Sequence, residues 1–223
     1  MDDAKIIKRF KTEKVKTAKN RKISSTRWLQ RQLNDPYVQE AKNRGYRSRA
    51  AFKILEIDEK FKIFKKNYKV LDLGSAPGGW SQVVSEKVGE NNILAVDILD
   101  MNPIAGVKFI KQNFLADNAE QIILSNMNNE KYDVVMSDMA ANTTGDKKLD
   151  HLRTMNLVES ALMFALKVLK NGGSFVSKIF MGGTEKELLD VLNKNFDTVK
   201  HFKPKSSRND SVEMYVVAKG FRG

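Results

Sequence analysis

The 223-residue chain contains no cysteine and only two histidines, His151 and His201, which lie far apart in the sequence. Disulfides and thiolate metal sites are therefore excluded, and we expect no metal centre. The chain has no apolar run of membrane-spanning length, and its N-terminus lacks the apolar stretch of a secretory signal. These absences predict a soluble, cytoplasmic protein with no membrane partner. Nothing in the sequence demands a dimer, so we expect a monomer.

Positive charge, by contrast, is abundant and unevenly distributed. The formal net charge is +12, and residues 1–53 hold 16 Lys and Arg against five Asp and Glu. The remaining 170 residues are almost neutral. A block of one sign of charge repels itself and binds polyanions, so we expect residues 1–26 to form a mobile basic arm that contacts nucleic acid. Residues 27–223 would form the folded domain, with 27–60 as a docking and RNA-contacting segment.

The stretch that organises this domain runs from Val70 to Trp80, V-L-D-L-G-S-A-P-G-G-W. Its apolar first half indicates a buried strand, and its glycines and Pro77 indicate a tight loop. A helical pattern starts after Trp80. A strand, a glycine loop and a helix N-terminus in this order bind nucleotide-like ligands in open α/β sheets.

The remaining pattern alternates strands with helices and predicts a Rossmann-like α/β fold. The sheet would have seven mostly parallel strands, helices on both faces and an antiparallel strand at the C-terminus. We expect Ser48 to cap a helix over 48–60, a loop over 141–149, and a stop signal at Asn171–Gly173 for the helix over 150–169. The expected strands are 69–73, 92–97, 107–110, 132–137, 174–180, 199–202 and 212–218, and the other expected helices are 79–87, 117–126, 150–169 and 184–195.

The loop G-S-A-P-G-G is neither the G-x-G-x-x-G dinucleotide fingerprint nor a phosphate-binding P-loop. Asp97, at the end of the second strand, is placed to reach ribose hydroxyls, and Asn113 could pair with an adenine edge. This combination fits S-adenosylmethionine, with its amino-acid tail near the glycine loop at Gly74. Trp80 is as consistent with packing as with a ligand wall.

Three ionisable residues stand where packing alone would not place them. Asp138 and Lys178 lie at the ends of apolar strands, and Glu213 begins another. Open α/β sheets build their sites at the carboxyl ends of strands. Glu213 would join the other two there only if its strand is antiparallel.

From about Ser25 to its end, the chain resembles the FtsJ-type (RrmJ/RlmE) family of ribosomal RNA 2′-O-ribose methyltransferases. The resemblance rests on S-S-T-R-W-L, R-S-R-A-A-F-K, D-L-G-S-A-P-G-G-W-S-Q, V-V-M-S-D-M-A, G-G-S-F-V-S-K-I-F, and K-P-K-S-S-R followed by E-M-Y-V-V-A. The chain departs from many members at Asn113, where they have Asp, and at Ala141, where they have Pro.

The resemblance implies methylation of a uridine ribose in 23S rRNA, on a late or assembled large ribosomal subunit. The family's catalytic tetrad would fall on Lys53, Asp138, Lys178 and Glu213. Its cofactor contacts would fall on Gly78, Trp80, Asp97, Asn113 and Asp138.

The tetrad suits proton removal from a hydroxyl group. Lys178 would be the general base, provided that burial and the nearby Lys53 cation lower its pKa. Asp138 would orient Lys178 and the sulfonium end of the cofactor, and Glu213 would position Lys53 or the ribose. Arg44, Arg47 and Arg49 surround an aromatic residue and suit RNA contacts, as do Lys205 and Arg208 of the K-P-K-S-S-R stretch.

Three alternatives stay open from the sequence. The same fold could methylate another RNA, such as tRNA. The chain could be a non-catalytic RNA-binding assembly factor, although its complete tetrad argues against this. It could also methylate a small molecule, against which the basic arm argues.

Overall fold

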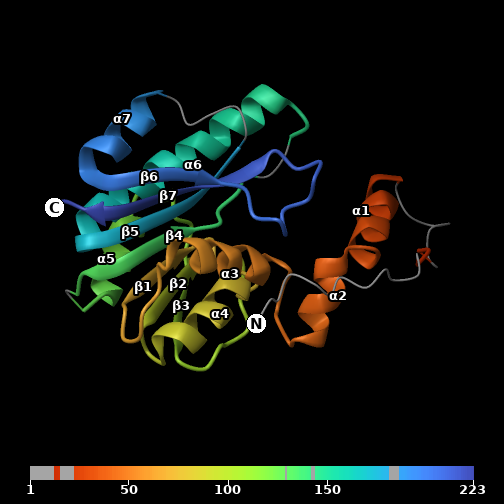
Figure 1. Cartoon of the computed structure of the whole chain (residues 1–223), viewed down its shortest axis with the longest axis horizontal. Helices are drawn as coiled ribbons and strands as arrows, with labels where there is room; N and C mark the ends of the chain where they lie inside the picture. Colours follow the sequence, from red (N-terminus) through yellow and green to blue (C-terminus); the bar gives the residue numbers. More distant parts are fainter. Residues whose placement is uncertain (1–12, 16–22, 129, 142–143, 181–185) are drawn as a thin grey trace.

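The protein, described here from a computed structural model, folds around a seven-stranded sheet in the order β3-β2-β1-β4-β5-β7-β6 (Figure 1). The structure describes residues 13–15, 23–128, 130–141, 144–180 and 186–223. The strands are β1 (Val70–Leu73), β2 (Ile93–Asp97), β3 (Val107–Lys111), β4 (Tyr132–Ser137), β5 (Leu169–Phe180), β6 (Phe196–Phe202) and β7 (Glu213–Phe221). The described helices are α1 (Ile23–Leu33), α2 (Pro36–Asn43), α3 (Ala50–Phe61), α4 (Gly79–Val88), α5 (Ala119–Asn126), α6 (Lys147–Val168) and α7 (Lys186–Asn195).

The first five strands run parallel, and β7 runs antiparallel to both β5 and β6. The predicted fold class and the predicted antiparallel C-terminal strands are therefore confirmed. Phe180 at the end of β5 pairs with Glu213 at the start of β7. The reversed direction of β7 thus brings Glu213 to the edge of the sheet where the parallel strands end.

Helices cover both faces of the sheet and create two cores. On one face α3 and α4 pack against inward residues such as Val70, Met136 and Val176. On the other face α5, α6 and α7 pack against residues such as Leu71 and Val135. Val70 and Leu71 are neighbours in β1 and belong to opposite cores, because successive side chains of a strand point to opposite faces.

The two N-terminal helices lie to one side of the sheet, next to α3 (Figure 1). Pro36 separates them because it occupies the first position of α2, where its missing N–H is not needed. The Asp35 side chain caps α2 by accepting the backbone N–H of Tyr37. Most of the expected basic arm, residues 1–26, lies outside the described residues, and α1 begins within its range at Ile23.

Three local predictions were wrong. Arg49, not Ser48, is the N-cap of α3, and the Ser48 hydroxyl is buried without a partner among the described residues. Helix α6 begins at Lys147, inside the expected loop, because the Asp146 carboxylate caps it. Strand β5 begins at Leu169 and not at the expected residue 174, because Leu169 already pairs with Tyr132 in the sheet; α6 ends at Val168, within one residue of its predicted end.

The remaining bounds differ from the predicted ones by a few residues at each end. Within the described part of the chain, no helix combines the length and apolar character that a membrane span requires.

Candidate active site

The edge of the sheet at which β4 and β5 end gathers the predicted catalytic residues. Asp138 follows β4 directly, and its N–H donates to the backbone oxygen of Leu73 at 3.1 Å. Lys178 lies near the end of β5, which is the neighbour of β4. Both positions follow from the parallel register, which sets the ends of adjacent strands side by side.

Lys178 and Asp138 make a two-point contact. The Lys178 ammonium donates to the backbone oxygen of Asp138 at 2.6 Å and lies 3.1 Å from its carboxylate Oδ1. The two side chains are 8% and 19% exposed. Burial alone would raise the pKa of Asp138, but the charges of Lys178 and Lys53 outweigh it and lower that pKa. Asp138 is therefore a carboxylate held ionised by the two lysines.

Lys53 and Glu213 form the second ion pair of the site. Lys53 comes from α3, which covers the sheet, and Glu213 comes from the start of β7. They are 160 residues apart in sequence and both largely buried. The four predicted catalytic residues thus form two ion pairs at one edge of the sheet.

Tyr215, which the sequence does not single out, joins these two pairs. Its hydroxyl lies 2.9 Å from Oδ1 of Asp138 and 2.9 Å from Oε1 of Glu213. Burial, followed by the charges of both carboxylates, raises the pKa of Tyr215 well above its usual value. A phenol has one proton, so it donates to one of the two carboxylates at a time.

The signal for Tyr215 was its spacing. It stands two residues after Glu213 in a strand, and residues with that spacing share a face.

The glycine loop joins β1 to α4 and takes the shape that its sequence predicts. Gly74 and Gly78 have φ values of +77° and +102°, which favour glycine. A Cβ at Gly74 would come within 2.7 Å of the Met139 side chain, so the loop leaves no room for one. Asp97, at the end of β2, fixes the loop by accepting the N–H of Ala76 at 2.8 Å.

The two residues expected to hold an adenosine lie at the ends of neighbouring strands. Asp97 ends β2 and is almost buried, and its second oxygen accepts the N–H of Leu99 at 2.8 Å. Asn113 follows β3 and is exposed, and its side-chain oxygen accepts the N–H of Leu115 at 3.1 Å. Leu99 and Leu115 expose large apolar side chains beside these polar groups, as does Ile98.

Trp80 belongs to the core under α4. It is 2% exposed, its indole N–H donates to the backbone oxygen of Ala50 at 2.9 Å, and its ring lies 5.6 Å from that of Tyr215. Of the two interpretations that the sequence allowed, these contacts support packing.

Asp72, inside β1, is a second site residue that was not predicted from the sequence. It is fully buried, accepts the Ser81 hydroxyl at 2.5 Å, and leaves its other oxygen without a partner among the described residues. Burial raises its pKa to about 7, and the hydrogen bond from Ser81 partly opposes this rise. An aspartate within the apolar run V-L-D-L was the signal that could have revealed it.

The arginines that were expected to contact RNA have different partners in the structure. Arg44 pairs with Glu40 at 2.6 Å, over the ring of Phe52. Arg47 donates to the backbone oxygens of Asn102 at 2.6 Å and Pro103 at 2.5 Å, close to the glycine loop.

Arg49 and Arg208, by contrast, converge on the carboxylate of Asp35. Lys205 is exposed in the same β6–β7 loop as Arg208. Arg49, Lys205 and Arg208 are therefore close together, whereas Arg47 contacts residues beside the glycine loop.

The residues at the sheet edge fit S-adenosylmethionine. Asp97 offers a carboxylate for ribose hydroxyls, and Asn113 offers an amide for adenine. Asp72 and Ser75, on either side of Gly74, have buried oxygens that lack partners among the described residues, and such atoms suit the polar groups of a ligand. Within the described residues, no group of three or more His, Asp or Glu could hold a metal ion.

The family model for FtsJ-like methyltransferases matches residues 46–221. The chain is 56% identical over 211 residues to the ribosomal RNA large subunit methyltransferase E of Novosphingobium aromaticivorans, with 95% of each chain covered. It is 57% identical over 218 residues to the protein of the same name from Paramagnetospirillum magneticum, with 95% of this chain and 89% of the relative covered.

Solved structures show the same likeness. A ribosomal RNA methyltransferase from Plasmodium falciparum superimposes with a TM-score of 0.71 at 34% identity, over 80% of this chain and 100% of that one.

Proposed function

The chain belongs to the FtsJ-like methyltransferase family, whose members use S-adenosylmethionine, and on this premise we propose that it methylates a ribose 2′-hydroxyl of large-subunit ribosomal RNA. One observation carries the proposal of the chemistry. It is the continuous series of contacts Lys178–Asp138–Tyr215–Glu213–Lys53 at the edge of the sheet where the cofactor residues also lie.

Lys178 is the proposed general base. When bound, S-adenosylmethionine supplies a methyl group activated by its positively charged sulfur. A neutral lysine amine has two N–H groups and one lone pair. The two oxygens of Asp138 within reach of Lys178 would accept both N–H groups and leave the lone pair free to take the hydroxyl proton.

Lys53 and Glu213 serve the RNA side of the reaction in this proposal. Their ion pair contacts the Tyr215 hydroxyl through Glu213, and both residues line a pocket on the protein surface. Lys53 would hold the ribose and its flanking backbone, while Glu213 keeps the Lys53 ammonium in place.

The choice of substrate follows the relatives. Proteins more than 50% identical over nearly the whole chain carry the name ribosomal RNA large subunit methyltransferase E. We propose 23S rRNA in a late or assembled large subunit as the substrate, with a uridine as the target. A monomer in the cytoplasm, where such particles lie, fits this role, with residues 1–26 as a basic arm on the RNA.

The test is a methyl-transfer assay. Large subunits from a strain that lacks the enzyme would be incubated with the protein and radiolabelled S-adenosylmethionine, and the labelled nucleotide would be mapped. We expect label on a ribose 2′-oxygen of one uridine of 23S rRNA. Label in tRNA instead would overturn the substrate, and cofactor binding without label in any RNA would overturn the catalytic role.

A further inference from the structure

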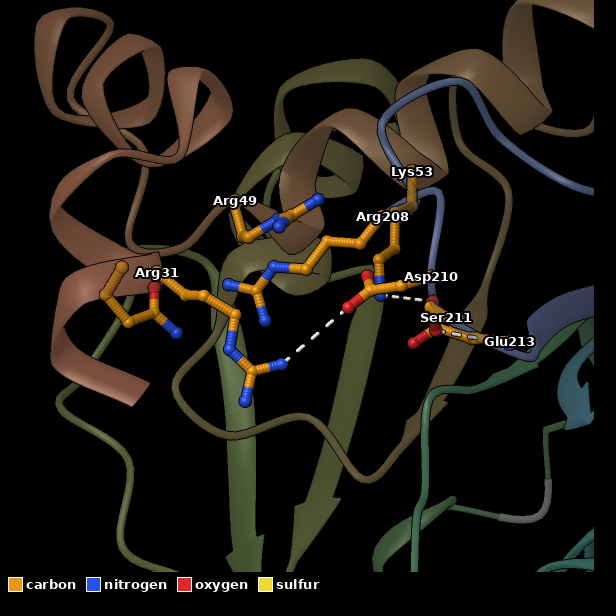
Figure 2. A pocket seen from close by; sticks show the side chains of 8 residues that line it. Arg31, Arg49, Lys53, Arg208, Asp210, Ser211 and Glu213 are labelled. Atoms are coloured by element: carbon orange, nitrogen blue, oxygen red, sulfur yellow. Dashed lines mark hydrogen bonds and ion pairs between the residues drawn. The ribbon is translucent and has the colours of Figure 1, made fainter. Parts of the chain in front are cut away.

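A polar pocket of about 290 Å³ opens beside the Lys53–Glu213 pair. We call it the arginine pocket (Figure 2). Its walls come from α1, the start of α3, and the loop that leads from β6 into β7. The lining residues are Arg31, Gln32, Arg49, Lys53, Arg208, Asp210, Ser211 and Glu213.

The arginine pocket carries more positive than negative charge. Four of its lining residues are cationic, and two, Asp210 and Glu213, are carboxylates. The buried carboxylate of Asp35, which contacts Arg49 and Arg208, is the third. Among the described residues, these four cations and three carboxylates leave a net charge of +1, which a single negative charge on a ligand would balance.

Arg49 and Arg208 both contact the carboxylate of Asp35, and each has a buried N–H donor without a partner among the described residues. Arg49 is 14% exposed and also donates to the backbone oxygen of Ser206, while its Nε has no partner among the described residues. Arg208 donates to Asp35 through Nε at 3.1 Å. One of its terminal nitrogens is buried and has no partner among the residues that the structure describes. Burial lowers the pKa of Arg49; Asp35 opposes this effect and the charge of Arg208 adds to it.

Buried guanidinium nitrogens without acceptors are costly unless a ligand supplies the acceptor. Arginine forks match the oxygens of phosphate in geometry and charge. Figure 2 shows the Arg49 and Arg208 side chains next to each other, and Arg31 reaching from α1 towards Asp210 on the opposite wall. The Arg31–Asp210 contact is long, 3.8 Å, and mostly exposed, so it would yield readily to an incoming anion.

We propose, on the premise of the function proposed above, that the arginine pocket binds one phosphodiester of the substrate RNA next to the target nucleotide, with Arg49 and Arg208 as its ligands. A phosphodiester brings the single negative charge that the pocket lacks. Lys53 and Glu213 line this pocket and also end the proposed catalytic series, so the bound phosphate belongs to the nucleotide being modified or to its neighbour. Asp35 acts as the positioning residue that holds both arginines.

The first experiment compares Arg208→Gln with wild type on large subunits that lack the modification. We expect the KM for the subunit to rise about 10- to 100-fold, as for a lost charged hydrogen bond, with kcat and the Kd for S-adenosylmethionine nearly unchanged. Arg208→Lys keeps the positive charge but loses the paired N–H donors of the guanidinium. Its KM for the subunit should lie between those of wild type and Arg208→Gln. The matched control is Arg222→Gln, which removes an arginine paired with Asp197 away from the pocket and should behave as wild type.

The second experiment identifies the bound group. Once the methylated nucleotide is mapped, a protein-free rRNA fragment would carry a neutral methylphosphonate at the linkage 5′ or 3′ of that nucleotide. One of these substitutions should weaken binding to wild type and have no further effect on Arg208→Gln. Arg208→Gln should also reduce the slope of log K against log salt by roughly 0.7 to 0.9, the contribution of one phosphate.

These outcomes separate the two proposals. If wild type methylates 23S rRNA but Arg208→Gln keeps the wild-type KM, or neither methylphosphonate weakens binding, the pocket does not bind an RNA phosphate. A KM effect on whole subunits without any effect on the protein-free fragment would point to an acidic protein partner and would also overturn the inference. If wild type methylates no ribosomal RNA, the proposed function itself fails.

Discussion

The Lys178 ammonium lies 2.6 Å from the backbone oxygen of Asp138 and 3.1 Å from its carboxylate. Asp138, which directly follows the strand next to that of Lys178, thus contacts the amine at two points. Both side chains are largely buried. Tyr215 then carries the contact from Asp138 to Glu213, whose partner is Lys53. A single network of hydrogen bonds and ion pairs therefore fixes the geometry of all four predicted catalytic residues.

Replacing Tyr215 by phenylalanine tests this bridge. The change removes the hydroxyl between Asp138 and Glu213 but leaves both lysine pairs in place, and the ring continues to fill the core. We expect the free energy of unfolding to fall by about 1 to 2 kcal/mol and methyl transfer to slow roughly tenfold. Chemical denaturation and single-turnover kinetics measure the two effects. Wild-type values of both would show that the bridge has no role.

Asp72 predicts a pH-dependent stability. Its pKa in the folded protein is raised to about 7 from an ordinary value of 3.8, so folding favours the neutral acid. This favourable contribution is present below the unfolded pKa and is lost as pH rises through 7. Relative to wild type, Asp72→Asn should therefore gain about 2 to 3 kcal/mol of stability between pH 5 and pH 8.5. Parallel stability curves for the two proteins would refute the assignment.

Trp80→Phe separates packing from cofactor contact. The buried indole N–H that bonds to Ala50 is lost, and a smaller ring leaves a cavity in the core. We expect a loss of about 1 to 3 kcal/mol in unfolding free energy, with the Kd for S-adenosylmethionine within about twofold of wild type. Calorimetric titration and thermal unfolding would measure both. A large loss of cofactor affinity at unchanged stability would make Trp80 a ligand wall instead.

Removal of residues 1–22 tests the proposed basic arm while keeping α1, which begins at Ile23. The deleted segment contains nine Lys and Arg. RNA binding should weaken and its salt dependence should flatten, because fewer phosphates are neutralised, while S-adenosylmethionine affinity stays the same. An unchanged salt slope would mean that the arm does not contact RNA.

The sequence predicted most of the fold because its periodicities were clear. Apolar strands, glycine turns and helical spacing marked every strand of the sheet to within a few residues, except the start of β5. The helix start at Lys147 was missed because a single capping carboxylate, Asp146, decided it within a polar segment. The early start of β5 at Leu169 was missed because its pairing with Tyr132 draws the residues of the predicted glycine turn into the strand.

Part of the candidate site could also be predicted from the sequence. Asp138, Lys178 and Glu213 stood out because charged residues are rare in apolar strands. Tyr215 did not stand out, since a tyrosine in a strand is ordinary; its spacing from Glu213 indicates a shared face, but only the tertiary fold also brings Asp138 to its hydroxyl. The separation of Arg47 from Arg49 and Arg208 likewise depends on long-range contacts that no local pattern records.

The central claim is that Lys178 removes the proton from the ribose hydroxyl, and substitution of this lysine tests it most directly. Single-turnover methyl transfer to large subunits and equilibrium binding of S-adenosylmethionine would be measured for Lys178→Ala, with Arg222→Gln as the control. We expect transfer to fall at least about 100-fold, the usual contribution of a general base, while cofactor affinity stays close to wild type. Transfer by Lys178→Ala at a rate near that of wild type would contradict the account.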